Sequence, residues 1–259
     1  MPHSQSTNKG FSLVELSIVL VILGLLVGGV LAGQSLIKAA QLRSVTTEYS
    51  RYITAVASFR DKYFALPGDM TNAQSFWGIT PVCPGTSASP STGTLTCNGD
   101  GDGRITWNNA PASNETYRFW QHLANAGLIE GSYNGVDGTA VGTNFPVSKL
   151  SNAGWATIWY GEVLANSATT FEGSYGNPFL FGTAATVGTG AILRPEEAWN
   201  IDTKLDDGKP ATGRVVTWET DGSGSCSDLA SSTTASLAAS VYQLSNNAFA
   251  VCRFIMKNP

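Results

Sequence analysis

The sequence predicts an α+β protein, with one long N-terminal helix followed by a globular domain of short strands, short helices and disulfide-closed loops. Residues 16–37 form an uncharged, mostly apolar run, and a stripe of apolar residues with helical spacing continues to residue 63. Beyond residue 65 the chain breaks into short apolar pieces separated by Gly, Pro, Asn and Ser, which is typical of strands and loops.

The uncharged run from Leu16 to Ile37 is long enough to cross a membrane. Its 22 residues would span about 33 Å as a helix, and the hydrocarbon core of a bilayer is about 30 Å thick. A buried helix of a soluble protein rarely has so long a run without a charge. A secretory signal peptide has a shorter apolar region that ends at small residues, which this run does not. We therefore expect a membrane-spanning segment.

The chain after this run has one apolar face. Apolar or aromatic residues recur at intervals of three and four, at Leu42, Val45, Tyr49, Tyr52, Val56, Phe59 and Tyr63. The positions between them include Arg43, Glu48 and Arg51, which we expect on the solvent side. Because no helix breaker occurs before Pro67, one helix is expected from Phe11 to about residue 63.

The residues around the start of the run resemble the prepilin signal of type IV pilins and of the pseudopilins of type II secretion. Residues 9–16 read Lys-Gly-Phe-Ser-Leu-Val-Glu-Leu after a short polar leader. The resemblance implies that a prepilin peptidase cleaves after Gly10 and that Phe11 becomes the N-methylated first residue. It also implies that Glu15 is the acid at the fifth position of the mature chain.

The resemblance, which covers about 55 of the 259 residues, also implies how the chain is organised. Residues 1–10 are then the leader and residues 65–259 a pilin-like globular domain. The helix between them, residues 11–64, divides into a part in the membrane or filament core (11–37) and an amphipathic part (38–64) that packs on an antiparallel sheet. The implied partners are a prepilin peptidase, an inner-membrane assembly platform and other pilins, in a homopolymer or heteropolymer.

Glu15 lies in the apolar segment, where a carboxylate is costly and points to a function. We expect it to pair with the positive N-terminal amine of a neighbouring subunit and so to set the register of a filament. The alternative is a glutamate whose side chain reaches the membrane interface. The alternative function is a membrane-anchored periplasmic binding module, stabilised by calcium and for example specific for glycans, which does not polymerise and needs neither the leader nor Glu15.

Composition argues against several other functions. Charged residues make up 13% of the chain, the formal net charge is −4, and no dense stripe of Lys and Arg is present, so no specific nucleic-acid site is expected. Only His122 follows the leader, and a surface or hydrogen-bonded residue is a simpler explanation for it than a catalytic base. The pairs Glu196-Glu197 and Asp206-Asp207 are expected at a helix start and in a turn. We therefore expect no enzyme.

The four cysteines are typical of an exported domain. They allow three pairings, and we choose Cys83–Cys97 with Cys226–Cys252 because each pair brackets a polar loop. Each closure would stabilise the fold by about 3 to 4 kcal/mol. The alternatives are free thiols or a metal site built from all four cysteines. The chain lacks the C-x-x-C spacing that is typical of such metal sites.

The exported domain sets the expected location. We expect a single-pass protein of the bacterial inner membrane with a periplasmic C-terminal domain, which then enters a pilus or pseudopilus at the cell surface or in the periplasm. The positive charges that follow the run would by themselves favour the opposite orientation, but long domains translocate largely regardless of charge.

Residues 98–105 match the first half of an EF-hand calcium loop, with a glycine, Gly103, at its sixth position. The expected ligands are the side chains of Asn98, Asp100 and Asp102, the backbone carbonyl of Arg104, and Glu115. Glu115 is included because the twelfth position is Asn109 instead of the usual glutamate. Calcium takes six to eight oxygens, and alternate short side chains on a flexible turn can converge on one ion. The alternative is a Gly/Asp turn that binds nothing.

Helices and strands are also expected in the globular domain. One helix is expected over residues 115–126, ended by Gly127, with Phe119, Trp120 and Leu123 facing inward. A second helix is expected to start at Pro195 and to run to about Leu205. Strands are expected in short pieces between residues 130 and 194, and then over residues 215–218 and 241–254.

Overall fold

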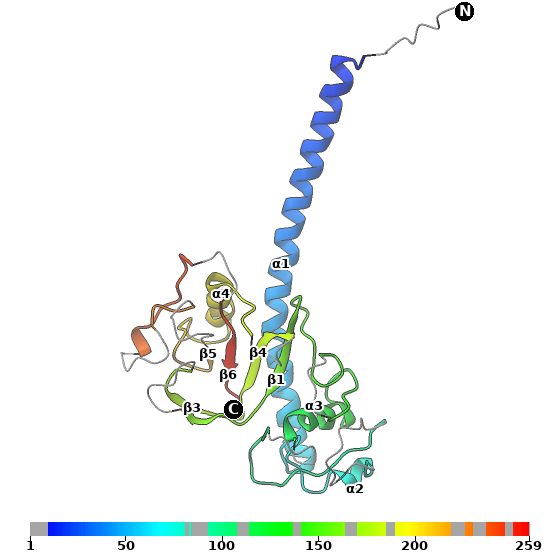
Figure 1. Cartoon of the computed structure of the whole chain (residues 1–259), viewed down its shortest axis with the longest axis vertical. Coiled ribbons are helices and arrows are strands. Elements are labelled where there is room, and N and C mark those ends of the chain that lie inside the picture. The colour runs from blue at the N-terminus through cyan, green and yellow to red at the C-terminus, as the bar shows by residue number, and fades with distance from the viewer. Residues whose placement is uncertain are drawn as a thin grey trace, which may run out of the picture. The chain divides into compact units, whose positions relative to one another are not determined.

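The longest element of the fold is α1 (Leu13–Tyr63), a helix of 51 residues, as the sequence predicts. The computed structural model describes residues 10–80, 83, 93–107, 114–136, 141–163, 170–184, 190–218, 226–229, 237–246 and 251–258. The chain divides into two units, Met1–Gln41 and Leu42–Pro259. The architecture is α+β and pilin-like in layout, with the elements labelled in Figure 1.

In the first unit, α1 is apolar on all sides. Its most apolar 18-residue window has a mean hydropathy of 2.7, and none of that window is buried. Side chains such as Leu20 and Leu25 are more than two-thirds exposed. By length and composition this helix can cross a membrane, which agrees with the predicted spanning segment.

The second unit is built on a four-stranded antiparallel sheet with the strand order β1-β4-β6-β5. Its strands are β1 (Ala153–Thr157), β4 (Phe179–Thr183), β5 (Val215–Thr217) and β6 (Phe254–Met256). A separate antiparallel pair joins β2 (Gly161–Val163) to β3 (Gly173–Gly176). The central strands bury side chains on both faces, so the sheet lies between two hydrophobic clusters, one on each face.

The apolar stripe of α1 packs on this sheet, as predicted (Figure 1). Val45, Tyr49, Tyr52, Val56 and Phe59 are buried, and Leu42 and Tyr63 are partly buried at the two ends of the stripe. The ring of Tyr52 lies 5.1 Å from Trp120 and 5.4 Å from Trp155, both in edge-on geometry. Aromatic rings therefore form the centre of the core.

Two of the short helices, α3 (Glu115–Asn125) and α4 (Pro195–Leu205), lie where the local sequence signals place them. The other two, α2 (Gln74–Trp77) and the 3-10 helix η3 (Leu237–Ala239), are not among the predicted helices. Gly127 follows α3 with a φ of +72°, and the Leu128 amide donates to the Leu123 carbonyl, which completes a Schellman motif. Pro195 is the first residue of α4, so that prediction is confirmed.

Two expectations about the second unit are wrong. Glu48 lies inside the protein, not on the solvent side, and accepts hydrogen bonds from Ser148 Oγ (2.7 Å), the Lys149 amide (2.9 Å) and Trp155 Nε1 (2.7 Å). Within 241–254, only Phe254 belongs to a strand, and 247–250 lie outside the described residues. Tyr242 and Cys252 each form only an isolated bridge, because the chain there follows a loop that a disulfide holds.

Both disulfides are local in sequence. Cys83 is bonded to Cys97, and Cys226 is bonded to Cys252. Cys252 of the second disulfide also exchanges backbone hydrogen bonds with Leu193, which lies just before α4. Much of the polar loop between Cys83 and Cys97 lies outside the described residues.

Candidate functional site

The segment expected to be processed precedes α1. The predicted leader, apart from Gly10, lies outside the described residues. Gly10 and Phe11 are exposed and not helical, with Phe11 85% exposed. A peptidase needs an accessible, extended backbone, so the junction after Gly10 has the accessibility that cleavage requires.

Glu15 has a local role that the sequence reasoning missed. Its Oε2 accepts a hydrogen bond from the Ser12 amide at 2.8 Å, while Ser12 Oγ accepts one from the Val14 amide at 3.3 Å. The Glu15 contact is one half of a capping box, and the Ser12 hydroxyl caps the amide at the second helical position instead of the third. The signal was present in the sequence, because Ser12 and Glu15 stand three positions apart before an apolar run.

A second candidate site lies in the globular unit, where four carboxylates meet. Asp69, Asp100, Asp102 and Glu115 each offer an oxygen within 4.8 Å of the others. They come from three segments: the turn after α1, the predicted calcium loop, and the first turn of α3. Oxygens at this spacing can coordinate one hard cation such as Ca²⁺.

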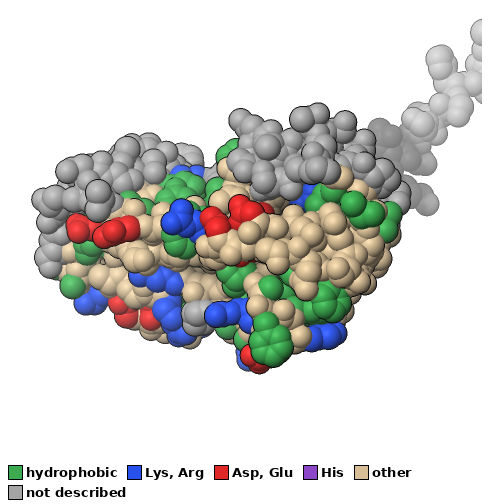
Figure 2. Space-filling view, turned by 90° about the horizontal axis from the view of Figure 1, so that it is seen from below, with side chains coloured by type: hydrophobic (Ala, Val, Ile, Leu, Met, Phe, Trp, Pro, Cys, Tyr) green, Lys and Arg blue, Asp and Glu red, His purple; other side chains and the backbone are tan. Residues whose placement is uncertain are grey.

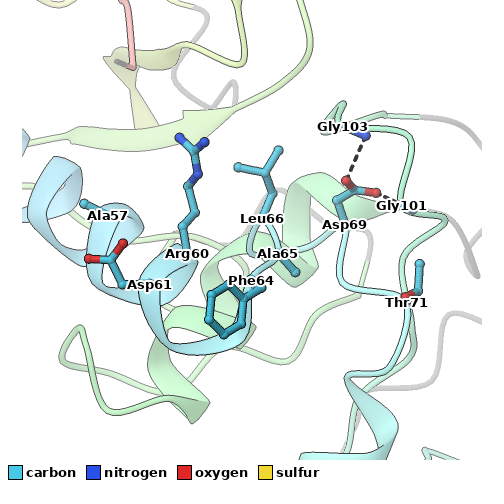
Figure 3. Close-up of a pocket in the computed structure, with 10 residues that line it drawn as sticks. All are labelled: Ala57, Arg60, Asp61, Phe64, Ala65, Leu66, Asp69, Thr71, Gly101 and Gly103. Carbon is cyan, nitrogen blue, oxygen red and sulfur yellow. Dashed lines mark hydrogen bonds between the residues drawn. The ribbon is translucent and has the colours of Figure 1, made fainter.

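Backbone amides of the loop hold Asp69 in place. Asp69 Oδ1 accepts from the Gly101 amide at 2.5 Å and Oδ2 from the Gly103 amide at 2.9 Å (Figure 3). Gly101 and Gly103 have φ values of +79° and +82°, which favour glycine. At Gly99, a Cβ atom would lie 2.4 Å from Asp69 Cα, so only glycine allows the two segments to approach this closely.

Glu115 is the buried member of the cluster. It is fully buried and accepts hydrogen bonds from the Asp100 amide (3.1 Å), the Thr106 amide (3.0 Å) and Thr106 Oγ1 (2.9 Å). Burial raises the pKa of Glu115 to about 7, although these hydrogen bonds oppose the shift. Burial also raises the pKa of Asp69, with the charges of Asp100 and Asp102 as smaller contributions. A bound cation would favour the ionised form of both carboxyl groups.

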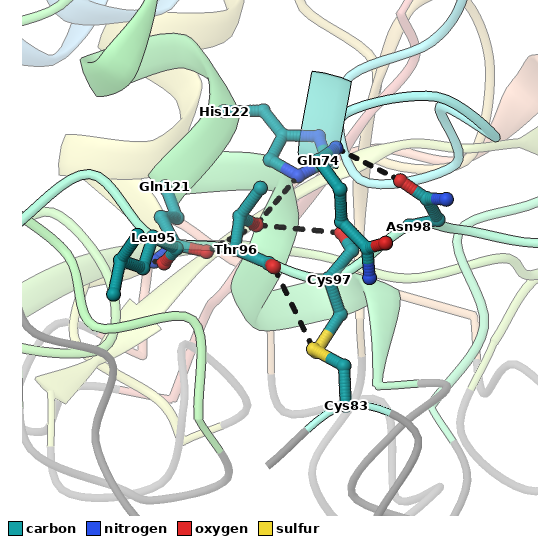
Figure 4. The surroundings of a disulfide bond; sticks show 8 residues. All are labelled: Gln74, Cys83, Leu95, Thr96, Cys97, Asn98, Gln121 and His122. Carbon is teal, nitrogen blue, oxygen red and sulfur yellow. Dashed lines mark hydrogen bonds between the residues drawn. A yellow bond between two sulfur atoms is a disulfide. The ribbon is translucent and has the colours of Figure 1, made fainter. Parts of the chain in front are cut away.

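The predicted ligand set changes in the structure. Asp100, Asp102 and Glu115 come together, and Asp69 joins them. Asn98 Oδ1 accepts a hydrogen bond from the Gln74 amide at 2.9 Å (Figure 4). This contact ties Asn98 to the start of α2, and its expected role as a calcium ligand stays a prediction. Asn109 lies outside the described residues.

Arg104 makes contacts through its amide and its side chain, and the expected ligand role of its carbonyl stays a prediction. Its amide donates to Asp102 Oδ1 at 2.8 Å, and its guanidinium lies over the Trp159 ring at 5.1 Å from the centroid. The Asp102 amide likewise donates to Asp100 Oδ1 at 3.1 Å. These local hydrogen bonds shape the loop around the two carboxylates.

A hollow of about 770 Å³ lies beside the carboxylates (Figure 3). Asp69, Gly101 and Gly103 form one side of it, and the end of α1 with Phe64 forms the other. Phe64 is 93% exposed and has a φ of +53°. Hydrophobic side chains also reach the surface elsewhere on the second unit, next to charged ones (Figure 2).

His122 is buried and hydrogen-bonded, which agrees with the expectation of a surface or hydrogen-bonded residue. Nδ1 accepts from the Gly68 amide at 3.0 Å, and Nε2 lies 3.0 Å from Thr96 Oγ1 (Figure 4). Because Thr96 donates its own proton to Gln121 Oε1 at 2.7 Å, the hydrogen-bond network assigns the His122 proton to Nε2. Burial lowers the pKa of His122 to about 3, with the Arg118 charge as a smaller cause. A neutral imidazole held in this way is a structural group.

Comparison with known proteins identifies the N-terminal segment. Residues 5–31 match a sequence family described as the prokaryotic N-terminal methylation motif. No curated protein and no solved structure matches the chain. The chain therefore carries the prepilin-type cleavage and methylation signal of type IV pilins and pseudopilins, and this signal supports a precursor of that type.

Proposed function

We propose that this protein is a structural subunit of a type IV pilus or of a type II secretion-like filament, cleaved after Gly10 and N-methylated at Phe11. The observation that carries the proposal is the methylation motif over residues 5–31, which contains Glu15. The subunit polymerises through α1, whose apolar side chains are exposed over the first unit of the chain. In a membrane, lipid covers them, and in a filament the same helix of neighbouring subunits covers them.

The partners and location follow from this role. A prepilin peptidase processes the chain, and an inner-membrane assembly platform inserts it among other pilins. Before assembly the protein spans the inner membrane once, with the second unit in the periplasm. The two disulfides support this side of the membrane, because disulfides persist in oxidising compartments.

Replacing Gly10 with valine should block processing and exclude the chain from filaments. Valine adds a branched side chain at the position after which the peptidase cuts, so the leader should remain attached. The measurement is the intact mass after co-expression with a prepilin peptidase, together with the protein content of the sheared filament fraction. The wild-type chain should begin at Phe11 and carry one additional methyl group.

The matched control is Gly33→Val, which changes a glycine of α1 beyond the methylation motif. A Cβ atom at Gly33 meets no neighbour within 4 Å, so the chain accommodates the substitution. This variant should be processed like the wild type. Normal cleavage of the Gly10→Val variant would refute the proposed junction.

The acidic cluster of the second unit has a structural role in this proposal, as a calcium site. Asp69, Asp100, Asp102 and Glu115 supply the protein ligands, and all four are hard oxygen donors. Burial raises the pKa of Glu115 to about 7, so calcium has to displace a proton from this carboxyl group at lower pH. Calcium there would join the end of α1 to α3 through the loop.

Calcium should raise the melting temperature of the detergent-solubilised protein by several degrees relative to EDTA. An ion that binds only the folded state adds about 2.7 kcal/mol at a hundredfold excess over Kd. The effect should be larger at pH 8 than at pH 6, because calcium must displace the Glu115 proton at the lower pH. Thermal unfolding followed by circular dichroism measures both differences.

Asp102→Asn tests the site with little change in shape, since an asparagine oxygen can still accept from the Arg104 amide. The variant should show a clearly smaller difference in melting temperature between calcium and EDTA than the wild type. Glu172→Gln, an exposed acid outside the cluster, is the control and should keep the wild-type response. Equal melting of the wild type in calcium and in EDTA would show that the loop is only a turn.

A further inference from the structure

A second group of carboxylates lies at the C-terminal end of α4, far in sequence from the calcium loop. Asp202 is in the last turn of α4, Asp206 is its C-cap residue, and Asp207 follows. Each offers an oxygen within 4.8 Å of the other two. The C-terminus of a helix carries a partial negative charge, so acids gathered there repel both one another and the helix dipole.

Asp202 is completely buried and incompletely paired. Its Oδ2 accepts a hydrogen bond from Tyr242 Oη at 2.8 Å. Its Oδ1 has no hydrogen-bond partner, although the Gly208 amide is near enough to favour the ionised form slightly. A buried acceptor without a partner is destabilising, so a ligand at this oxygen would be favourable.

Asp206 and Asp207 shape the turn that surrounds Asp202. Asp206 Oδ2 accepts hydrogen bonds from the amides of Arg214 and Val215. Asp207 Oδ1 accepts one from the Lys209 amide at 2.9 Å, and its Oδ2 accepts one from Thr212 Oγ1 at 2.7 Å. All of these donors are neutral, so they orient the two carboxylates without cancelling their charge.

The basic side chains of the turn have carbonyl partners instead. Lys209 Nζ donates to the Ala238 carbonyl at 2.7 Å, and Arg214 Nη2 donates to the Leu205 carbonyl at 2.9 Å. Within the described ranges, none of the three carboxylates forms a salt bridge. The negative charge of the cluster is therefore uncompensated by side chains of the described chain.

We propose that Asp202, Asp206 and Asp207 bind a divalent cation of the calcium class, distinct from the one at the predicted loop. Three carboxylate oxygens within 4.8 Å fit around one ion at Ca–O distances of about 2.3 to 2.6 Å, and water completes the shell. The ion gives the unpaired Asp202 oxygen a partner and removes the repulsion at the helix end. It thereby ties α4 to the turn that leads into β5.

Calcium stoichiometry tests the proposal on the detergent-solubilised full chain, by equilibrium dialysis with radioactive calcium at physiological salt. The double variant Asp206→Asn with Asp207→Asn should bind one ion fewer per chain than the wild type. Asparagine retains an acceptor oxygen for the amides of Arg214 and Val215 at position 206 and for the Lys209 amide at position 207. At position 207 its amide nitrogen can donate to the Thr212 hydroxyl, which then accepts instead of donating. Glu162→Gln, an exposed acid outside both clusters, should leave the stoichiometry unchanged.

The two calcium sites are tested separately. Asp69→Asn with Asp102→Asn removes charge from the loop site only, so this variant should still bind the ion at α4. If the loop of the wild type binds no calcium, the binding expected at α4 is unaffected. If the Asp206→Asn, Asp207→Asn variant binds as many ions as the wild type, or if the loop variant binds none, the α4 site is refuted.

Terbium luminescence gives a second readout, in which all three carboxylates of the α4 site stay in place. The Trp199 indole borders the turn, since its Nε1 lies 3.6 Å from the position of a Cβ atom at Gly208. In the Asp69→Asn, Asp102→Asn variant, bound Tb³⁺ should emit on tryptophan excitation, and Trp199→Phe should remove most of this emission. Undiminished emission after Trp199→Phe would place the ion elsewhere, even if the Asp206→Asn, Asp207→Asn variant failed to fold.

Discussion

Glu15→Ala should abolish filaments while the amount of protein inserted in the membrane stays the same or rises. Removing a carboxylate from an apolar segment lowers the free energy of insertion, so the precursor should still accumulate. Filament register should be lost, because the positive N-terminal amine of a neighbouring subunit would have no negative partner in a medium of low dielectric constant. Membrane fractionation and the yield of sheared filaments from cells with the complete assembly machinery measure the two effects.

The capping contacts at the start of α1 call for two further variants. Glu15→Gln keeps an oxygen that can accept from the Ser12 amide but removes the charge, and it should also abolish filaments. Ser12→Ala removes the hydroxyl that caps the Val14 amide but leaves the charge, and it should keep them. The reverse pattern, with filaments in Glu15→Gln and none in Ser12→Ala, would show that Glu15 acts by capping the helix.

The buried His122 should make the second unit sensitive to acid. Its pKa is about 3 in the folded state against the usual 6.5, because the site accepts only the neutral imidazole. The unfolded chain therefore binds the proton first, and the contribution of His122 to stability is complete above pH 6.5 and declines as the pH falls toward 3. The full loss is about 4 to 5 kcal/mol, or about 1.4 kcal/mol per pH unit.

Two buried carboxyl groups act in the opposite direction and have to be separated from this effect. Burial raises the pKa of Glu115 and of Asp202 to about 7, so without a metal ion both groups favour the folded state as the pH falls from 7 toward their unfolded values. The measurement is therefore a difference between two chains. Urea unfolding of the wild type and of His122→Gln should be compared at several pH values between 4.5 and 7.5.

Glutamine is the matched replacement, since its oxygen can accept from the Gly68 amide and its nitrogen can donate to Thr96 Oγ1. Any advantage of the wild type should shrink by about 1.4 kcal/mol for each pH unit below 6.5. Parallel pH profiles for the two proteins would contradict the lowered pKa of His122.

Local signals in the sequence were sufficient for the three longer helices, α1, α3 and α4. The span of α1 follows from the spacing of its apolar stripe and from the absence of a breaker before Pro67, and the structure ends the helix at Tyr63. Pro195 and Gly127 likewise mark the start of α4 and the end of α3. These predictions succeed because capping and periodicity involve residues within one or two turns of each other.

The long apolar run and the motif around Gly10 and Glu15 also depend only on neighbouring residues. A bilayer selects for length and lack of charge, and a peptidase reads a short segment, so neither requires knowledge of the tertiary fold. The capping contact between Ser12 and Glu15 belongs to the same class and could have been found from its three-residue spacing.

Only the tertiary structure decided which polar side chains are buried and what they meet. Glu48 reaches Trp155, more than one hundred positions away, and Asp69 joins the predicted calcium loop, which begins 29 positions later at Asn98. Asp202 meets Tyr242 in the same way. No periodicity records such contacts, because a polar group can be buried only where a distant segment supplies its hydrogen bonds, and that depends on how the whole chain packs.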